Sequence, residues 1–171
     1  MLIGIAFAFV LILVQVGASI GIELFLRYVL GVRIIHEGAG NDVEVFISGM
    51  DVLVLILMIL VMIFIVGPCE EILFRGFMQR GLVRTLGDTW GIIITAIIFA
   101  AIHLVGLILY ILDPIVFIIL FIYMFAPYIA LSIMLCLIFR WREENLIAVI
   151  VTHGVYNSLL ILIAFLFMVF Y

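Results

Sequence analysis

Long apolar runs alternate with short polar connections along the whole chain. The runs are Leu2–Ile22, with an apolar continuation toward Leu30, then Ile47–Val66, Trp90–Leu112, Pro114–Phe139 and Leu146–Tyr171. Each is close to the roughly 20 apolar residues that a helix needs to cross the hydrocarbon core of a membrane. None alternates apolar and polar residues in the way that marks a membrane strand. The pattern predicts an all-α, polytopic transmembrane bundle of about five spans.

The composition agrees with a chain whose solvent is lipid. Of its 171 residues, 70% are hydrophobic and 11% charged, and the mean hydropathy is +1.62. A soluble domain is near half apolar and a quarter charged, and one of this size could not bury so much apolar surface. We therefore expect a single multi-pass domain over residues 1–171, in contact with lipid and located in the plasma membrane. The net charge of -4 argues against a nucleic-acid partner.

The arginines predict how the chain is oriented. With five spans, the polar segments Cys69–Asp88 and Arg140–Asn145 lie on the same side as the N-terminus. That side carries most of the basic residues, namely Arg75, Arg80, Arg84, Arg140 and Arg142. Because basic residues stay on the cytoplasmic side, we expect the N-terminus inside, the C-terminus outside and any site near these segments open to the cytoplasm.

Ionisable groups next to or inside the spans are the candidate functional residues, since burying them in lipid is costly. Glu71 and Arg75 are four residues apart, so they meet on one helix face as an ion pair. Glu70 points about 100° away from them and has no obvious partner along the helix. A carboxylate of this kind, held in an apolar site, is suited to act as a general base.

Two further polar clusters lie in otherwise apolar runs. His103 follows Phe99 by four residues, and His153 precedes Asn157 by four residues on one helix face. At about 1.5 Å per residue, these groups reach a depth similar to that of Glu70, provided that the helix continues through Pro68. Taken singly, each cluster has a structural explanation as a helix cap or a packed histidine. Their shared depth favours a functional site.

These three motifs, in this order on successive helices, resemble the CAAX protease and bacteriocin-processing family of intramembrane proteases. The family includes the type II CAAX prenyl endopeptidases and the abortive-infection-like bacterial proteins. The stretch Glu-Glu-Ile-Leu-Phe-Arg-Gly-Phe-Met-Gln-Arg-Gly-Leu is very similar to the family's first motif, and the resemblance covers about residues 51–160. It implies an endopeptidase acting on a membrane-associated peptide or protein, whether prenylated or not.

The resemblance also implies roles for single residues. Glu70 matches the glutamate that activates the attacking water, and His103 matches the histidine that helps to hold this water. His153 and Asn157 match residues that bind the oxyanion. The pair Glu71–Arg75 matches a supporting ion pair that orients the site.

Whether a metal takes part is left open by these residues. Glu70, His103 and His153 could provide the three ligands of a catalytic zinc site, with the fourth position taken by water. The helical His-Glu-x-x-His pattern of common zinc proteases is absent, however. A water activated by glutamate alone is the interpretation that we favour, with no tightly bound metal in the resting enzyme.

Other functions compete with the peptidase hypothesis. A non-enzymatic immunity or scaffold protein of the same family would keep the polar cluster as a structural network. A haem held by His103 and His153 would leave the acidic residues unexplained, and a transporter would show an internal repeat, which is absent. Relatives usually have one or two additional N-terminal helices, so we also consider a second copy of the chain that closes the site.

Overall fold

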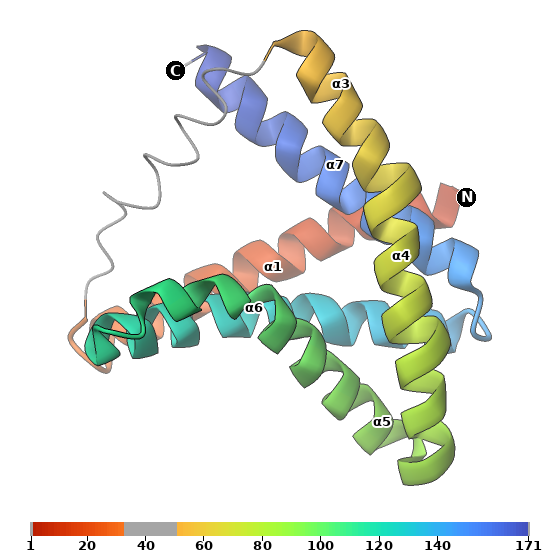
Figure 1. Cartoon of the computed structure of the whole chain (residues 1–171), viewed down its shortest axis with the longest axis horizontal. Coiled ribbons are helices and arrows are strands. Elements are labelled where there is room, and N and C mark those ends of the chain that lie inside the picture. The colour runs from red at the N-terminus through yellow and green to blue at the C-terminus, as the bar shows by residue number, and fades with distance from the viewer. Residues whose placement is uncertain (1, 33–50, 171) are drawn as a thin grey trace.

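The computed structural model describes residues 2–32 and 51–170 as a bundle of long helices (Figure 1), and these residues contain no strand. The elements are α1 (Leu2–Tyr28), α3 (Val52–Val61), η1 (Met62–Val66), α4 (Gly67–Glu71), η2 (Ile72–Gln79), α5 (Arg80–His103), η3 (Val105–Tyr110), α6 (Pro114–Trp141) and α7 (Leu146–Phe170). Most of the polar connection Gly31–Glu44, the predicted start of a span at Ile47 and the last residue, Tyr171, lie outside the described residues.

Four helical runs among the described residues are long and apolar enough to cross a membrane. They are Leu2–Tyr28, Val52–His103, Pro114–Trp141 and Leu146–Phe167. The predicted all-α membrane bundle is therefore confirmed. The second run contains parts of two predicted spans, because the chain reverses within it.

The reversal takes place at Gly87. This residue has φ 80° and ψ 169°, outside the helical region, inside what is otherwise a continuous helix. Only glycine adopts such a conformation without a steric penalty. Figure 1 shows the outcome: the rod formed by α3 and α4 descends to a tight turn, and α5 leads back toward the middle of the molecule.

The predicted third span ends earlier than its apolar pattern indicates. The α-helix stops at His103, and a 3-10 helix, Val105–Tyr110, follows before Asp113 caps α6 by accepting a hydrogen bond from the Val116 N–H. The prediction of one span to Leu112 is thus wrong in its last third. Both helix types leave apolar side chains facing outward here, so the hydrophobic pattern cannot distinguish them.

The helix continues through Pro68, as the depth argument requires. Pro68 has no N–H, and its ring needs space near the carbonyl of the preceding turn. The chain supplies this space with a π-helical turn, η1, in which the Gly67 N–H donates to the Met62 carbonyl five residues back. Residues 52–86 therefore form one long helix that carries Glu70 and Glu71 at its middle.

The long helix packs mainly against α7 and α5, and α1 joins the bundle through α6 and α7. α1 and α6 run side by side, and α7 packs against α1, α4 and η1 (Figure 1). The main buried core joins α1, η2, α5, α6 and α7; its members include Leu11, Phe74, Phe99, Leu135 and Tyr156. A smaller cluster around Leu55 joins α3 to α7. The ring of Phe7 meets Trp141 edge-on at 5.5 Å, which puts the start of α1 at the same end of the bundle as the Arg140–Asn145 turn.

Candidate active site

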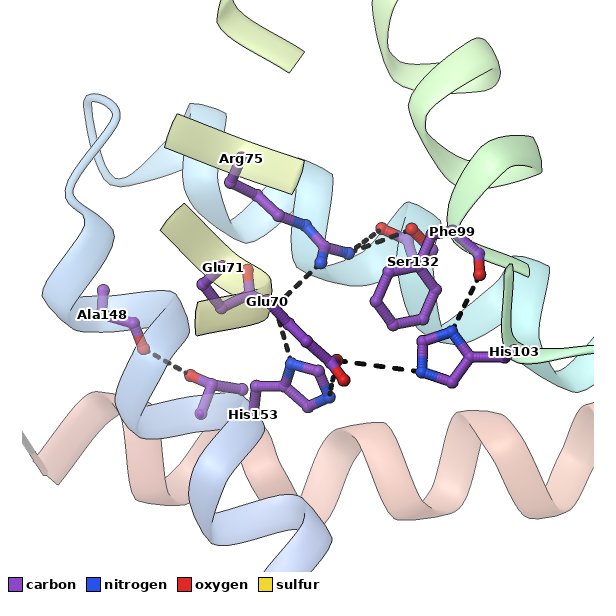
Figure 2. A network of polar contacts seen from close by, with 9 residues as sticks. Glu70, Glu71, Arg75, Phe99, His103, Ser132, Ala148 and His153 are labelled. Atoms are coloured by element: carbon purple, nitrogen blue, oxygen red, sulfur yellow. Dashed lines mark hydrogen bonds and ion pairs between the residues drawn. The ribbon is translucent and has the colours of Figure 1, made fainter. Parts of the chain in front are cut away.

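A fully buried polar network lies where α4, η2, α6 and α7 meet. Arg75 Nη1 donates to Glu71 Oε1 at 2.8 Å, the ion pair that their spacing predicts, and both side chains are 0% exposed. Arg75 Nη2 also donates to Ser132 Oγ at 3.0 Å and to the Ser132 carbonyl at 3.3 Å. His153 Nδ1 lies 2.7 Å from the same Glu71 oxygen. We call Glu71, Arg75, Ser132 and His153 the buried network (Figure 2).

The contacts of the two histidines determine which ring nitrogen carries a proton. His103 Nδ1 lies 2.8 Å from the Phe99 carbonyl, which can only accept, so this nitrogen donates. His153 Nδ1 donates in the same way to the Glu71 carboxylate. Both rings therefore turn the opposite nitrogen, Nε2, toward the side chain of Glu70.

Glu70 faces these two nitrogens from the neighbouring helix. Its Oε2 lies 3.8 Å from His103 Nε2 and 3.7 Å from His153 Nε2 (Figure 2). These separations are too long for direct hydrogen bonds but suit a bridging water. Glu70 Oε2 is buried and has no hydrogen-bond partner among the described residues. The oxygen is thus placed to act on a small molecule held between it and the histidines.

Two glycines allow the elements that carry these groups to approach closely. A Cβ on Gly67 would lie 3.2 Å from the Gly154 Cα, and one on Gly154 would lie 3.1 Å from the Ile63 Cα. The backbones of α7 and of the long helix therefore touch directly at this level. Gly154 directly follows His153, so this contact holds the His153 ring against both glutamates.

Phe99 gives the Phe-x-x-x-His motif a physical role. Its ring stacks on His103, with centroids 4.1 Å apart, and the Arg75 guanidinium lies 4.8 Å from the centroid of the same ring. Its carbonyl holds His103 Nδ1. Phe99 thus fixes the orientation of His103 and separates it from the buried network.

A cavity of about 310 Å³ opens beside Glu70. Both polar and apolar side chains line it; the full set is Gln15, Met62, Val66, Glu70, His103, Tyr128, Leu131, His153, Tyr156, Asn157, Leu160 and Ile161. Of the six residues predicted for the site, Glu70, His103, His153 and Asn157 line this cavity. The other two, Glu71 and Arg75, lie behind it in the buried network.

Several residues of the site escaped the sequence analysis. Ser132 and Gln15 each interrupt an apolar run, and that interruption is the signal that could have found them. Tyr128 is one of several aromatic residues in its run and gives no such signal. Tyr156 is 1% exposed, and its hydroxyl has no partner among the described residues although it borders the cavity. Its position three residues after His153 resembles ordinary core packing, so nothing in the sequence distinguished it.

Glu70 lies somewhat farther from the two histidines than two ligands of one zinc ion lie from each other. Zinc holds nitrogen and oxygen ligands at about 2.0–2.1 Å, which puts neighbouring ligand atoms about 3.3 Å apart. The separations from Glu70 to the two histidines are wider, at 3.7 and 3.8 Å. Within the described ranges, no group of three His, Cys, Asp or Glu side chains is arranged to hold a metal ion.

Comparison with known protein families agrees with this arrangement. A family model described as "Type II CAAX prenyl endopeptidase Rce1-like" matches residues 52–159, well over half of the chain. The chain belongs to this family. No curated protein and no solved structure gave a match.

Membership confirms the resemblance drawn from the three motifs. At the level of the family, the chain is an intramembrane protease of the CAAX type, and its apolar helices make it an integral membrane protein in contact with lipid. The matched segment runs from the start of α3 into α7 and contains all six predicted site residues. It does not include α1, although α1 contributes Gln15 to the cavity.

Proposed function

We propose that the protein hydrolyses a peptide bond of a membrane-associated substrate, using a water molecule activated by Glu70. One observation carries the proposal: a buried, unpartnered carboxylate oxygen faces the Nε2 atoms of two histidines across 3.7 and 3.8 Å, at the edge of a cavity. A water between these groups would donate one proton to Glu70 while His103 helps to hold it.

In the proposed reaction, Glu70 takes a proton from the water as its oxygen attacks the carbonyl carbon of the scissile bond. The carbonyl oxygen then carries negative charge. Asn157 borders the cavity and can donate its amide N–H to this oxygen, a type of stabilisation worth a few kcal/mol. His153 Nε2 faces the same space as Glu70, and the contact between His153 Nδ1 and Glu71 holds the ring in that orientation. Glu70 finally passes its proton to the departing amine.

Cleavage of a fluorogenic, farnesylated C-a-a-X peptide by the purified protein in detergent tests this proposal. Glu70→Gln keeps the side-chain shape but removes the base, so the rate should fall by about 10²- to 10⁴-fold. Arg84→Gln changes an exposed residue of the same long helix and should leave the rate unchanged. Full activity of Glu70→Gln would contradict the mechanism.

The same assay addresses the substrate and the metal. Cleavage of the farnesylated peptide but not of its unmodified form would identify prenylated proteins as the substrate class, whereas equal rates would indicate a broader set of membrane peptides. We propose that the resting site is metal-free, so a chelator should leave the rate unchanged. Loss of activity with the chelator, restored by zinc, would contradict this.

We also propose that the protein lies in the plasma membrane with its cavity open to the cytoplasm. The support comes from charge: the end of the bundle near the Gly87 turn and the Arg140–Asn145 turn carries several arginines, and basic residues stay cytoplasmic. A cysteine at the exposed position 143, in a background without Cys69 and Cys136, should react with an impermeant thiol reagent only in inverted vesicles. Labelling in intact cells would reverse the orientation.

A further inference from the structure

α1 carries an amide side chain on the face that it packs into the protein. Buried positions Gly4, Ala8, Leu11 and Leu26 recur along this helix. At 100° per residue, Gln15 falls within about 40° of all of them. Along this face the N-terminal half of α1 is apolar, and Gln15 is its first polar residue, followed one turn later by Ser19.

Gln15 reaches the cavity of the candidate active site. It lines this cavity together with Glu70, His153 and Asn157, although it comes from a helix outside the segment that the family model matches. Its amide has no hydrogen bond to another residue in the part of the chain that the structure describes. The side chain of Gln15 is only half-buried, so its amide is accessible from the cavity and can form hydrogen bonds with a molecule that enters there.

We infer that Gln15 binds the main chain of the peptide substrate, an inference that rests on the proposed peptidase function. A glutamine amide offers a carbonyl acceptor and an N–H donor side by side, which matches the donor and acceptor of a peptide group. The charged and imidazole groups of the cavity are committed to the reaction. Gln15 is a neutral amide, and it can hold the substrate without joining its proton transfers.

The surroundings of Gln15 fit an extended peptide with apolar side chains. Met62, Val66, Leu160 and Ile161 line the same cavity and offer no side-chain hydrogen bonds of their own. A peptide entering here buries its side chains against these residues, while its main-chain N–H and C=O groups lose water. Gln15 would replace that water at one peptide group, so α1 would help to fix which peptide bond lies beside Glu70.

A series of substrate peptides, each with one N-methylated main-chain amide, tests this role. In the wild-type protein, N-methylation of the peptide group that Gln15 binds should raise KM by about three- to tenfold, the equivalent of one neutral hydrogen bond. Gln15→Leu should show the same rise with the unmodified peptide, an unchanged kcat, and no further loss when that one group is methylated. Ser19→Ala, one turn along α1 and outside the cavity lining, serves as the matched control.

The outcomes separate this inference from the proposed function. If the wild type cleaves peptides and Gln15→Leu matches it throughout the series, Gln15 has no role in substrate binding. A loss spread evenly over the series, with a lower unfolding midpoint, would make Gln15 a packing residue. If the wild type cleaves nothing, the proposed function fails, and binding of the labelled peptide is compared between Glu70→Gln and Glu70→Gln/Gln15→Leu. Equal binding, or none by either, then overturns the inference.

Discussion

The buried network and a second set of ion pairs tie the long helix to the rest of the bundle, but only the first is shielded from solvent. The second set, the outer network, consists of Arg80, Asp88, Arg140 and Glu144. Arg80 Nε donates to Glu144 at 2.9 Å, and Arg140 donates to Glu144 at 2.6 Å and to Asp88 at 2.8 Å. Its side chains are 33–60% exposed, whereas Glu71 and Arg75 are fully buried.

This difference in exposure separates two tasks that similar residues perform. An exposed ion pair contributes only about 0–1 kcal/mol, because water screens it and the side chains lose freedom when they pair. Removing one partner from a buried pair costs about 3–5 kcal/mol, since the other charge is left without compensation. The outer network therefore orients the turns at one end of the bundle, while the buried network determines whether the site exists.

The largest expected effect comes from Arg75→Met, which leaves the Glu71 carboxylate paired with His153 alone. We expect the free energy of unfolding to fall by about 3–5 kcal/mol, and peptide cleavage to be lost with it. Unfolding in detergent with increasing SDS measures the first, and the fluorogenic assay the second.

Arg84→Met provides the control for Arg75→Met. Arg84 is exposed and lies on the same long helix, so the same change of residue type should alter stability by less than about 0.5 kcal/mol. Equal effects of the two substitutions would mean that burial does not distinguish these arginines, and the comparison of the two networks would then fail.

A smaller effect is expected from Gly154→Ala, which changes no charge. The added methyl group would lie 3.1 Å from the Ile63 Cα, so α7 must move away from η1 and carry His153 with it. Overpacking of this kind costs about 1–3 kcal/mol of folding free energy. The cleavage rate should fall by a larger factor than the fraction of folded protein does, because His153 is displaced in the molecules that remain folded. Gly21→Ala, where a Cβ meets nothing within 4 Å, should change neither. A fully active Gly154→Ala would show that the His153 position is not set by this contact.

The sequence predicted those parts of the site that depend on one helix at a time. The Glu71–Arg75 pair follows from a four-residue spacing, and Glu70 stood out as the carboxylate on another face. The contact of His153 with Glu71 joins residues 82 positions apart. It depends on how α7 docks through two glycines, which local periodicity does not encode.

The fold shows the same limit. Apolar runs predicted the membrane helices, because lipid requires them, but not the reversal at Gly87 or the 3-10 helix after His103. A helix in lipid has apolar residues on every side, so its buried face leaves no periodic signal. The break in the apolar run at Gln15 marks the residue but does not show which cavity it lines. Pairing with a second copy of the chain, considered because relatives have more spans, stays a prediction.

The smallest effect, and the sharpest test of the comparison, concerns salt. Arg140→Gln removes the contacts to Asp88 and Glu144 in the outer network and should lower stability by about 0.2–1 kcal/mol at low ionic strength. The Debye length shrinks to about 3 Å at 1 M salt, so this difference from the wild type should largely disappear there. The effect of Arg75→Met should persist, because ions do not reach side chains that are 0% exposed. If both differences shrink together as salt is added, the buried network is open to solvent, and the water that Glu70 activates would not be held in a protected site.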